Sequence, residues 1–359
     1  MGRHRIALIR GDGIGPELMD AALRVLDAAS EVGGAELEYL EIDAGADTYR
    51  RTGAACSATD FERLRHEVAA TLKGPVGLPD VRLPDGTEAG LLGGVLRTGL
   101  DTYANIRPVL LLPGVTSCLS GRKAGDIDYV IVRENTEGLY ASRGKGVGNE
   151  WAVADTLLAT REGTLRVARK AFEIASGRDG APGDGVRRVT CVDKSNVLRS
   201  HALFRRLVTE AAQEWPGIEV EYLHADAAAQ ALVLRPEHFD VLVMENFLGD
   251  VLSDLGGATV GGISLCPSGN VGAGAAYFEP IHGSAPSLAG RGVANPIGQL
   301  LAAAMMLDHL GEYTAAVAVR SAVSAALADG TARIEQDGSA RGGAQAVADA
   351  VVTALRSGR

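Results

Sequence analysis

Two aspartates that lie four residues apart are the first candidates for chemistry in this sequence. On a helix, Asp250 and Asp254 would project from one face, where like charges are unfavourable unless a cation lies between them. Oxygen ligands of this kind suit Mg²⁺ or Mn²⁺. A solvated acidic face is the alternative, and apolar neighbours such as Phe247 and Leu252 weaken it. Asp226, which follows a strand-like segment, is a third carboxylate in this acidic constellation.

Three arginines stand beside apolar residues of strand-like or helix-like segments. They are Arg97, Arg107 and Arg133. A buried arginine is costly without an acidic partner, which can be an internal carboxylate or a bound one. Any one of them could form a structural ion pair. Together they indicate an anionic substrate that carries several carboxylates.

A lysine and a tyrosine are candidates for proton transfer. Lys194 follows the end of a strand-like segment, and Tyr140 ends a turn. A lysine close to a metal and to cationic groups can have its pKa lowered enough to act as a base, and a tyrosine can act as an acid. Considered alone, both are ordinary surface residues.

A glycine-rich loop, residues 11–17 (GDGIGPE), connects a strand to a helix near the N-terminus. Its glycines permit close backbone approach, and a helix N-terminus attracts anions such as a cofactor phosphate. The spacing fits neither the Rossmann fingerprint, which needs glycine where Pro16 stands, nor a Walker loop. A plain tight turn is the alternative.

The elements that must position these residues alternate between strand and helix. Predicted strands are 5–10, 37–42, 129–133, 189–192, 220–223 and 240–245. Predicted helices are 16–30, 60–69 (opened by an acidic cap), 161–175, 200–214 and 227–234, followed by a helical C-terminal third. This alternation indicates an α/β architecture with a parallel or mixed sheet, and 359 residues favour about two domains.

Composition excludes several classes of protein. The net charge is −10, which disfavours a nucleic-acid binder, and 46% hydrophobic residues disfavour disorder. The longest clean apolar run, residues 300–307, is far shorter than the roughly 18 residues of a membrane span. The N-terminus lacks the features of a signal peptide, so we expect a cytoplasmic protein. The four cysteines have no metal-ligand spacing and are expected to be small buried residues.

In combination, the motifs resemble the β-decarboxylating (2R)-hydroxyacid dehydrogenases, the family of isocitrate, 3-isopropylmalate, homoisocitrate and tartrate/D-malate dehydrogenases. The resemblance covers nearly the whole chain. Its motifs are GDGIGPE (11–17), LKGPVG (72–77), YANIRP (103–108), VRENTEGLY (132–140), DKSNVL (193–198), ENFLGDVLSD (245–254), EPIHGSAP (279–286) and NP (295–296).

The resemblance implies a fold that is not a Rossmann fold. It implies two α/β domains with a large mixed sheet. The first, on the cofactor side, would combine residues 1–101 and 257–359; the second, residues 102–256, would carry the dimer interface and the metal and catalytic residues. It also implies a homodimer whose sites are shared, with Lys194 and Asp226 supplied by the second chain.

The resemblance also assigns roles to residues. Asp226, Asp250 and Asp254 would bind Mg²⁺ or Mn²⁺, which would chelate the substrate, and Arg97, Arg107 and Arg133 would bind its carboxylates. Lys194 would remove the hydroxyl proton through water while hydride leaves for the nicotinamide, and Tyr140 would protonate the enol that remains after loss of CO₂. The matching cofactor contacts are Ile14, Asn196, Glu279, His282, Gly283, Ser284, Ala285, Ser287 and Asn295.

Two departures from the family pattern bear on specificity. Ser287 stands where NAD-using members usually have aspartate, and the cation of NADP-using members is also missing, so NAD is favoured and NADP is not excluded. Leu91 and Leu92 resemble the apolar substrate pocket of isopropylmalate enzymes, but Gly93 and Gly94 separate them from the first arginine. Either the leucines are looped away or the glycines take their positions. Both alternatives predict a roomier or differently lined pocket.

These features predict NAD(P)- and metal-dependent oxidative decarboxylation of a 3-substituted (2R)-malate to a 2-oxo acid and CO₂. The best single candidate is 3-isopropylmalate; homoisocitrate, tartrate, D-malate and a specialised malate, such as a phosphonate-bearing one, are alternatives. A non-catalytic regulatory subunit is the rival class, and retention of Lys194, Tyr140 and all three aspartates argues against it.

Overall fold

The computed structural model describes residues 2–84 and 86–358, which fall into two compact units. Unit 1 comprises Met1–Leu100, Leu112–Thr116 and Gly261–Arg359. Unit 2 comprises Asp101–Leu111 and Ser117–Val260. Compared with the division expected from the motifs, the short segment 112–116 belongs to unit 1, and the second junction follows residue 260 rather than 256.

Unit 1 contains strands in the order β2–β1–β3–β12–β11. The pairs of β1 with β2, β1 with β3 and β12 with β3 are parallel, and β11 with β12 is antiparallel. The strands are β1 (Arg3–Ile9), β2 (Glu36–Glu41), β3 (Ala70–Lys73), β11 (Pro267–Val271) and β12 (Ala276–Pro280). The helices are α1 (Gly15–Gly33), α2 (Ala46–Thr52), α3 (Ala58–His66), α4 (Leu92–Gly99), α9 (Ile297–His309), α10 (Tyr313–Ala328) and α11 (Gly343–Ser357), with short 3₁₀ turns at Ile263–Leu265 and Pro286–Leu288.

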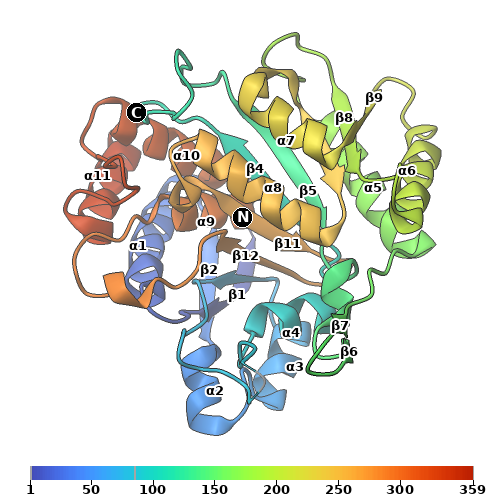
Figure 1. Cartoon of the computed structure of the whole chain (residues 1–359). Coiled ribbons are helices and arrows are strands. Elements are labelled where there is room, and N and C mark those ends of the chain that lie inside the picture. The colour runs from blue at the N-terminus through green and yellow to red at the C-terminus, as the bar shows by residue number, and fades with distance from the viewer. Residues whose placement is uncertain (1, 85, 359) are drawn as a thin grey trace. The chain divides into compact units, whose positions relative to one another are not determined.

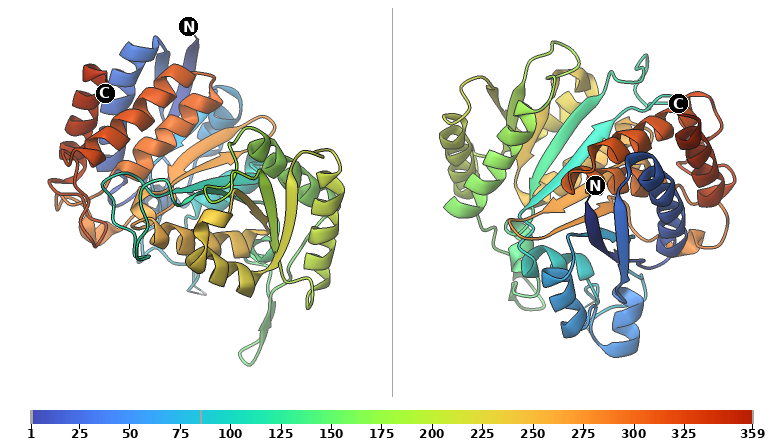
Figure 2. Two further views of the ribbon diagram at one scale, coloured as in Figure 1. Left: turned by 90° about the horizontal axis from the view of Figure 1, so that it is seen from above. Right: turned by 180° about the vertical axis from the view of Figure 1, so that it is seen from behind.

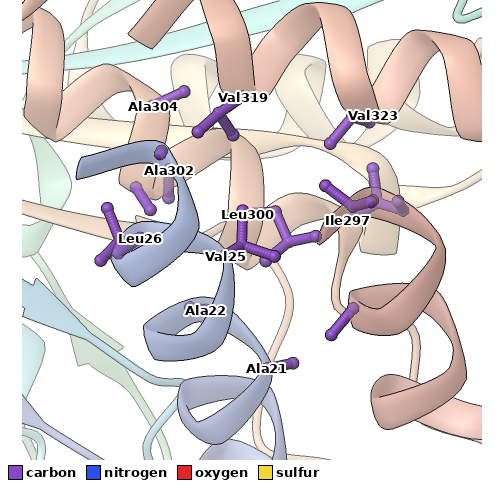
Figure 3. Packing of buried hydrophobic residues seen from close by; sticks show 14 of the residues in the cluster. Ala21, Ala22, Val25, Leu26, Ile297, Leu300, Ala302, Ala304, Val319 and Val323 are labelled. Carbon is purple, nitrogen blue, oxygen red and sulfur yellow. The ribbon is translucent and has the colours of Figure 1, made fainter. Parts of the chain in front are cut away.

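The main core of unit 1 lies among α1, α9, α10 and α11, which pack side by side (Figure 1). Alanines alternate with larger side chains at these contacts, as Ala22, Val25, Leu300 and Val319 do in Figure 3. Small residues let the helix backbones approach closely, and the larger ones fill the space between them. The prediction that the Ala-rich C-terminal third is helical is confirmed. The structure adds that these helices form much of the core of unit 1.

Unit 2 contains strands in the order β4–β5–β10–β8–β9. β4 and β5 are antiparallel, whereas the remaining neighbours are parallel. The strands are β4 (Ala104–Leu110), β5 (Asp128–Glu134), β8 (Arg188–Asp193), β9 (Glu219–His224) and β10 (Val241–Met244). The helices are α5 (Arg161–Ser176), α6 (Arg199–Ala212), α7 (Ala225–Leu234) and α8 (Asn246–Thr259), with 3₁₀ turns at Leu139–Ser142 and Pro236–His238.

A small hairpin, β6 (Val147–Gly148) with β7 (Val153–Ala154), extends from the body of unit 2 (Figure 2). Its side chains Val147, Trp151 and Val153 are all strongly exposed. Apolar side chains gathered on an exposed arm are unusual in a monomer.

Most predicted elements are present, with two corrections in detail. The helix predicted at 60–69 is α3, which begins at Ala58 and ends at His66. Its N-cap is Ser57, whose Oγ accepts a hydrogen bond from the Asp60 N–H. The acidic cap predicted at residue 60 is therefore wrong. Cys191 and Cys266 are buried as expected, but Cys118 is exposed. Within the described ranges, no helix has the length and apolar character needed to cross a membrane.

Candidate active site

The candidate active site in unit 2 is built on two arginines of neighbouring strands. Asn105 of β4 lies opposite Arg133 of β5, and Arg107 lies two residues further along β4. Because side chains on a strand alternate between faces, Arg107 and Arg133 point to the same face of the sheet. Both are almost completely buried, with 5% and 0% of their surface exposed.

Helix α8 packs against these strands and presents a polar face to the arginines. Asn246, Asp250 and Asp254 follow one another at four-residue spacing, so they share one side of the helix. The helix is capped by Glu245, whose carboxylate accepts from the N–H groups of Phe247 and Leu248. This cap satisfies two of the orphan amides at the helix start and anchors the polar face.

Asp250 is the centre of the contacts. One carboxylate oxygen pairs with Arg133 and lies 3.5 Å from Nη2 of Arg107, and the other accepts a 2.7 Å hydrogen bond from the Tyr140 hydroxyl. Asp254 Oδ1 lies 3.8 Å from Arg107 Nη1. The two carboxylates thus have internal cationic partners, which is one of the two possibilities that the sequence left open for the arginines.

Neutral side chains of α8 and β4 accept further hydrogen bonds from the arginines. Arg133 donates to Asn246 Oδ1 from Nε at 3.0 Å and from Nη2 at 2.7 Å. Arg107 donates to Asn105 Oδ1 and to Ser253 Oγ, both at 2.5 Å. Buried guanidinium groups need several acceptors, and these bonds orient each fork toward Asp250.

Glycine at position 249 is required by the approach of α8 to Arg133. A Cβ added there would lie 2.5 Å from Cγ and 2.6 Å from Cβ of Arg133. Gly256 is similar, since an added Cβ would lie 2.6 Å from the Tyr129 hydroxyl. At both positions the close approach of α8 to the strands leaves no room for a side chain.

Tyr140 lies in the 3₁₀ turn Leu139–Ser142, beside the start of α8. Its ring packs edge-on against Phe247 at a centroid distance of 6.3 Å. The guanidinium of Arg133 lies 5.6 Å from the ring centroid, and that of Arg143 lies 5.8 Å away. The phenol is therefore held by one hydrogen bond and by two nearby cations.

Lys194 and Asp226 form a separate pair at the carboxyl ends of β8 and β9. The Lys194 ammonium contacts Asp226, and this hydrogen bond lowers the pKa of the Asp226 carboxyl. The Asp226 side chain is 72% exposed, and Asn196 is exposed in the adjacent turn. Among the residues that the structure describes, no three His, Cys, Asp or Glu side chains of one chain are grouped to hold a metal ion.

In unit 1, the predicted cofactor segment interlocks with the glycine-rich loop. The Ile14 N–H donates to the Ser284 carbonyl at 2.8 Å, and the Ser284 hydroxyl donates to the Gly77 carbonyl. Gly13 has φ +57°, and an added Cβ would overlap the Ser284 carbonyl oxygen. The loop therefore needs glycine here for conformation and for space.

Asp12 connects this loop to two further segments. Its carboxylate accepts from the N–H groups of Ala46, Asp47 and Gly77 at 2.8–3.0 Å, and only 5% of the residue is exposed. It thus acts as a remote cap for α2 and as a tie to the loop after β3. Asp12 was not predicted as a functional residue, although an aspartate inside a glycine loop is a common capping residue.

Glu279, the penultimate residue of β12, lies beside Lys73 of β3, in the register set by the parallel pairing of these strands. The Lys73 ammonium contacts the Glu279 carboxylate, and Asn270 Nδ2 donates to it at 3.1 Å. Lys73 is 1% exposed. The sequence did not lead us to predict this buried pair. A lysine at the end of the otherwise uncharged segment 70–73 was the signal that could have indicated it.

The other predicted cofactor residues follow β12. His282 Nδ1 lies 2.9 Å from the Gly283 carbonyl, its Nε2 is buried without a hydrogen-bond partner among the described residues, and burial lowers the pKa of the imidazole. Asn295 is buried, and its amide bonds Ser264, Gly338 and the Ile297 N–H. The remaining residues are Ile14 (buried), Gly283 and Ser287 (exposed) and Ala285, which has φ +37°.

Helix α4 carries Arg97 and resolves the question of the two leucines. Leu92 is fully buried in a core cluster with Leu96, so its side chain belongs to the interior. Leu91 is half-buried at the helix start. Gly93 and Gly94 lie in the first turn, one helical turn before Arg97, and a Cβ added at Gly93 would meet nothing within 4 Å. The glycines therefore occupy the positions that precede the arginine on its face of the helix.

The chain is similar to known proteins over nearly its whole length. A family model described as isocitrate/isopropylmalate dehydrogenase matches residues 5–351. The chain is 43% identical to 3-isopropylmalate dehydrogenase of Corynebacterium aurimucosum, covering 98% of this chain and 99% of the relative, and 42% identical to isocitrate/homoisocitrate dehydrogenase of Thermus thermophilus, covering 99% of each.

Among solved structures, isocitrate dehydrogenase from Methylococcus capsulatus superposes with a TM-score of 0.86 at 35% identity, covering 98% of this chain and 99% of that chain. The fold expected from the motifs is confirmed by this match.

Proposed function

Because the chain belongs to the isocitrate/isopropylmalate dehydrogenase family and is a dehydrogenase of that family, we propose that it oxidatively decarboxylates a 3-substituted (2R)-malate, using NAD and a divalent metal. The first candidate substrate is 3-isopropylmalate. The product would be a 2-oxo acid, with CO₂ and NADH.

The observation that carries this proposal is the group around Asp250. Two buried arginines, a tyrosine hydroxyl and two carboxylates of one helix face converge on one edge of unit 2. Arg107 and Arg133 supply N–H groups in a fixed fork geometry that suits a substrate carboxylate. Without substrate, Asp250 balances their charge.

The donor set at this edge fits a hard divalent cation. Asp250 and Asp254 offer carboxylate oxygens one helical turn apart, and Mg²⁺ typically takes one or two carboxylates and keeps the rest of its shell for water and substrate. Such an ion supplies Lewis-acid chemistry, polarising the oxygen at C2. Asp226 would complete the protein ligands from a second copy of the chain.

Lys194 and Tyr140 would move the protons. Lys194 would accept the proton of the C2 hydroxyl through its amine, and its contact with Asp226 would keep the ammonium close to the metal ligands. Tyr140 would donate its phenol proton to C3 after CO₂ leaves. Its bond to Asp250 orients the hydroxyl for that step.

The segment after β12 fits a nicotinamide dinucleotide. Glu279 is a carboxylate held in place by Lys73 and Asn270, and such an acceptor can bind ribose hydroxyls. Because His282 donates Nδ1–H to a carbonyl, its buried Nε2 is an acceptor with no hydrogen-bond partner among the described residues, and a cofactor N–H that reached it would supply one. Ser287 offers no positive charge for a 2′-phosphate, which supports NAD over NADP.

The first turn of α4 would admit the substituent at C3 of the substrate. Gly93 leaves open space one turn before Arg97, Leu91 is half-buried, and Leu92 is withdrawn into the core. This supports a pocket that accepts substituents larger than isopropyl. Homoisocitrate and specialised malates therefore stay in the substrate panel.

Two copies of the chain would share each site. Exposed apolar side chains of unit 2 support this arrangement, because a second copy would cover them. They are Val147, Trp151, Val153, Leu234, Phe247 and Val251. The separation of Lys194 and Asp226 from a complete metal group within one chain supports it as well.

The deciding assay is reduction of NAD and NADP across a panel of (2R)-malates, with Mg²⁺ or with EDTA. We expect one alkyl-substituted malate to reduce NAD only when metal is present. Lys194→Ala should abolish turnover, while Lys123→Ala, at an exposed position, should leave it unchanged. Activity that is indifferent to EDTA, or no reduction with any substrate, would rule the proposal out.

Complementation tests whether sites are shared. Lys194→Ala and Asp250→Asn are each expected to be inactive alone. If Lys194 serves the partner's site, a dimer with one copy of each variant has one site in which both residues are intact. Random mixing of the two variants makes about half of the dimers mixed, so about a quarter of the activity returns. If no activity returns after exchange of chains, each site is built from one chain.

A further inference from the structure

His201 is a buried histidine that the proposed chemistry does not use. It lies in the first turn of α6 and is 3% exposed. Its Nδ1 accepts a 2.8 Å hydrogen bond from the backbone N–H of Lys194, and its Nε2 is buried without a hydrogen-bond partner among the described residues. Such an arrangement at the amide of a proposed base calls for an explanation.

The Lys194 amide is the first one beyond the sheet. The parallel pairing of β8 with β9 ends at Asp193, so the next N–H has no strand partner. In the turn that follows, the Lys194 carbonyl accepts from Val197 and Leu198, at 3.0 and 2.9 Å. The imidazole of His201 therefore fixes the peptide unit that precedes the Cα of Lys194, while these two bonds fix the unit that follows it.

A second residue of α6 holds the neighbouring position. Arg205, four residues after His201 and on the same face of the helix, donates to the Asp193 carboxylate at 2.6 and 3.0 Å. Asp193 in turn accepts from the Ser195 N–H at 2.8 Å. One face of α6 thus secures the turn on both sides of Lys194.

Resting on the proposed function, we propose that His201 is a positioning residue for Lys194: it accepts the Lys194 N–H through Nδ1 and so sets the direction in which the lysine side chain leaves β8. Since Nδ1 faces a donor, the proton of the neutral imidazole is on Nε2. An N–H placed on Nδ1 would oppose the amide and release it.

Three variants test whether the hydrogen-bond acceptor of His201 or only the volume of its side chain is needed. In His201→Asn, the amide oxygen stands close to where Nδ1 stood and can accept the same bond. His201→Leu has nearly the shape of asparagine and no acceptor. His201→Gln places its oxygen further out, near the former Nε2, and serves as the comparison with asparagine should the leucine variant fail to fold.

The kinetic expectation is a fall in kcat without a matching change in KM. Misplacement of a reacting group by about 1 Å can cost about 10²-fold, so we expect His201→Leu and His201→Gln to lose about 10- to 100-fold in kcat. KM for substrate and cofactor should stay within about twofold, because the residues that bind them are untouched. His201→Asn should recover kcat to within about threefold of the unmodified protein.

Hydrogen exchange measured by mass spectrometry on a peptide containing residues 194–198 gives a readout independent of activity. Exchange at the Lys194 amide should be faster in His201→Leu or His201→Gln and close to normal in His201→Asn. Equal kcat in the Asn variant and its comparison variant, or equal exchange, would overturn the positioning role. If the unmodified protein reduces neither NAD nor NADP with any malate, the proposed function fails, and the exchange result alone decides whether His201 fixes the turn.

Discussion

The proposed cofactor segments of unit 1 and the charged group of unit 2 are held in place by different kinds of contact. In unit 1, Gly13, Ser284 and Gly77 meet largely through backbone atoms at very short range, and the Asp12 carboxylate connects the segments. In unit 2, Arg107, Arg133 and Asp250 are positioned by side-chain hydrogen bonds on otherwise regular strands and a regular helix.

This difference determines how amino-acid substitutions in each region should affect stability and activity. Interlocked backbones leave no room for an added atom, so substitution there should cost folding stability first. A cluster of charges on regular elements can lose one functional group and still fold, so substitution there should cost activity first.

Asp250→Asn should lower kcat by about a thousandfold, because a metal that polarises the substrate contributes several kcal/mol to the transition state. The free energy of unfolding should fall by about 1–3 kcal/mol, because two buried arginines lose a charged partner while asparagine can still accept a hydrogen bond from Arg133. Steady-state kinetics and urea unfolding measure the two effects. Asp349→Asn, which removes an exposed ion pair with Arg24, is the matched control and should change neither. A large loss of stability in Asp250→Asn would break the contrast.

Gly13→Ala should destabilise the protein by at least about 3 kcal/mol, because a Cβ at positive φ would also overlap the Ser284 carbonyl. Gly53→Ala has a similar positive φ and open space around it, so it should cost only about 1–2 kcal/mol. Urea unfolding midpoints give the comparison. Equal losses would mean that left-handed backbone strain, and not the interlocking, determines the cost.

Mg²⁺ or Mn²⁺ should stabilise the protein through the carboxylates of α8. At about 100 times its dissociation constant, a metal that binds only the folded state adds about 2.7 kcal/mol to the free energy of unfolding. Asp254→Asn should lose most of this gain while keeping the stability of the metal-free protein. Thermal unfolding with metal and with EDTA measures it, and an equal gain in both proteins would place the metal elsewhere.

Each unit holds a buried histidine whose pKa is lowered, mainly by burial. For His201, the negative charges of Glu245 and Asp193 partly offset the lowering of the pKa by burial. For His282, the charge of Glu279 partly offsets it, and the positive charge of Lys73 lowers the pKa further. Because the unfolded chain binds the proton first, stability should fall as pH drops below about 6.5, by at most about 1.4 kcal/mol per pH unit for each group.

Unfolding by urea between pH 7 and 5 tests this prediction. His201→Asn and His282→Asn should each flatten the slope, and the double variant should flatten it further. If one substitution leaves the slope of the unmodified protein unchanged, the corresponding histidine does not titrate differently in the folded and unfolded states.

Much of the fold followed from local pattern. The apolar periodicity of α1, α5 and α6 and the short β-branched runs of β5, β8 and β10 predicted elements close to those observed. The third helix was shifted because Ser57 and Asp60 are both good caps, and the sequence does not say which one the chain uses. Strands β3, β11 and β12 were missed because four or five residues carry too little periodicity. Strand β4 was also missed, because Arg107 and Pro108 interrupt its apolar pattern.

The candidate site was predicted by residue type, but its contacts were not. The spacing of Asp250 and Asp254 showed that they share a helix face, and Asn246, one turn earlier, could have been added by the same rule. Nothing local indicated that Arg107 and Arg133 would be the cations beside them, or that Leu92 would turn into the core. Those facts depend on strand register and on how helices pack.

The sequence by itself determined the α/β pattern, the motifs that identify the family and the residue types that can bind a polyanion, a metal and a nicotinamide. These are properties of short segments, because spacing along a helix or strand decides which side chains share a face. Only the tertiary structure decided that α8 meets β4 and β5 through an arginine–aspartate group, that Asp12 ties three loops together and that His201 reaches the Lys194 amide. Such contacts join residues up to 147 positions apart, as Arg107 and Asp254 are, and only the packed chain brings them together.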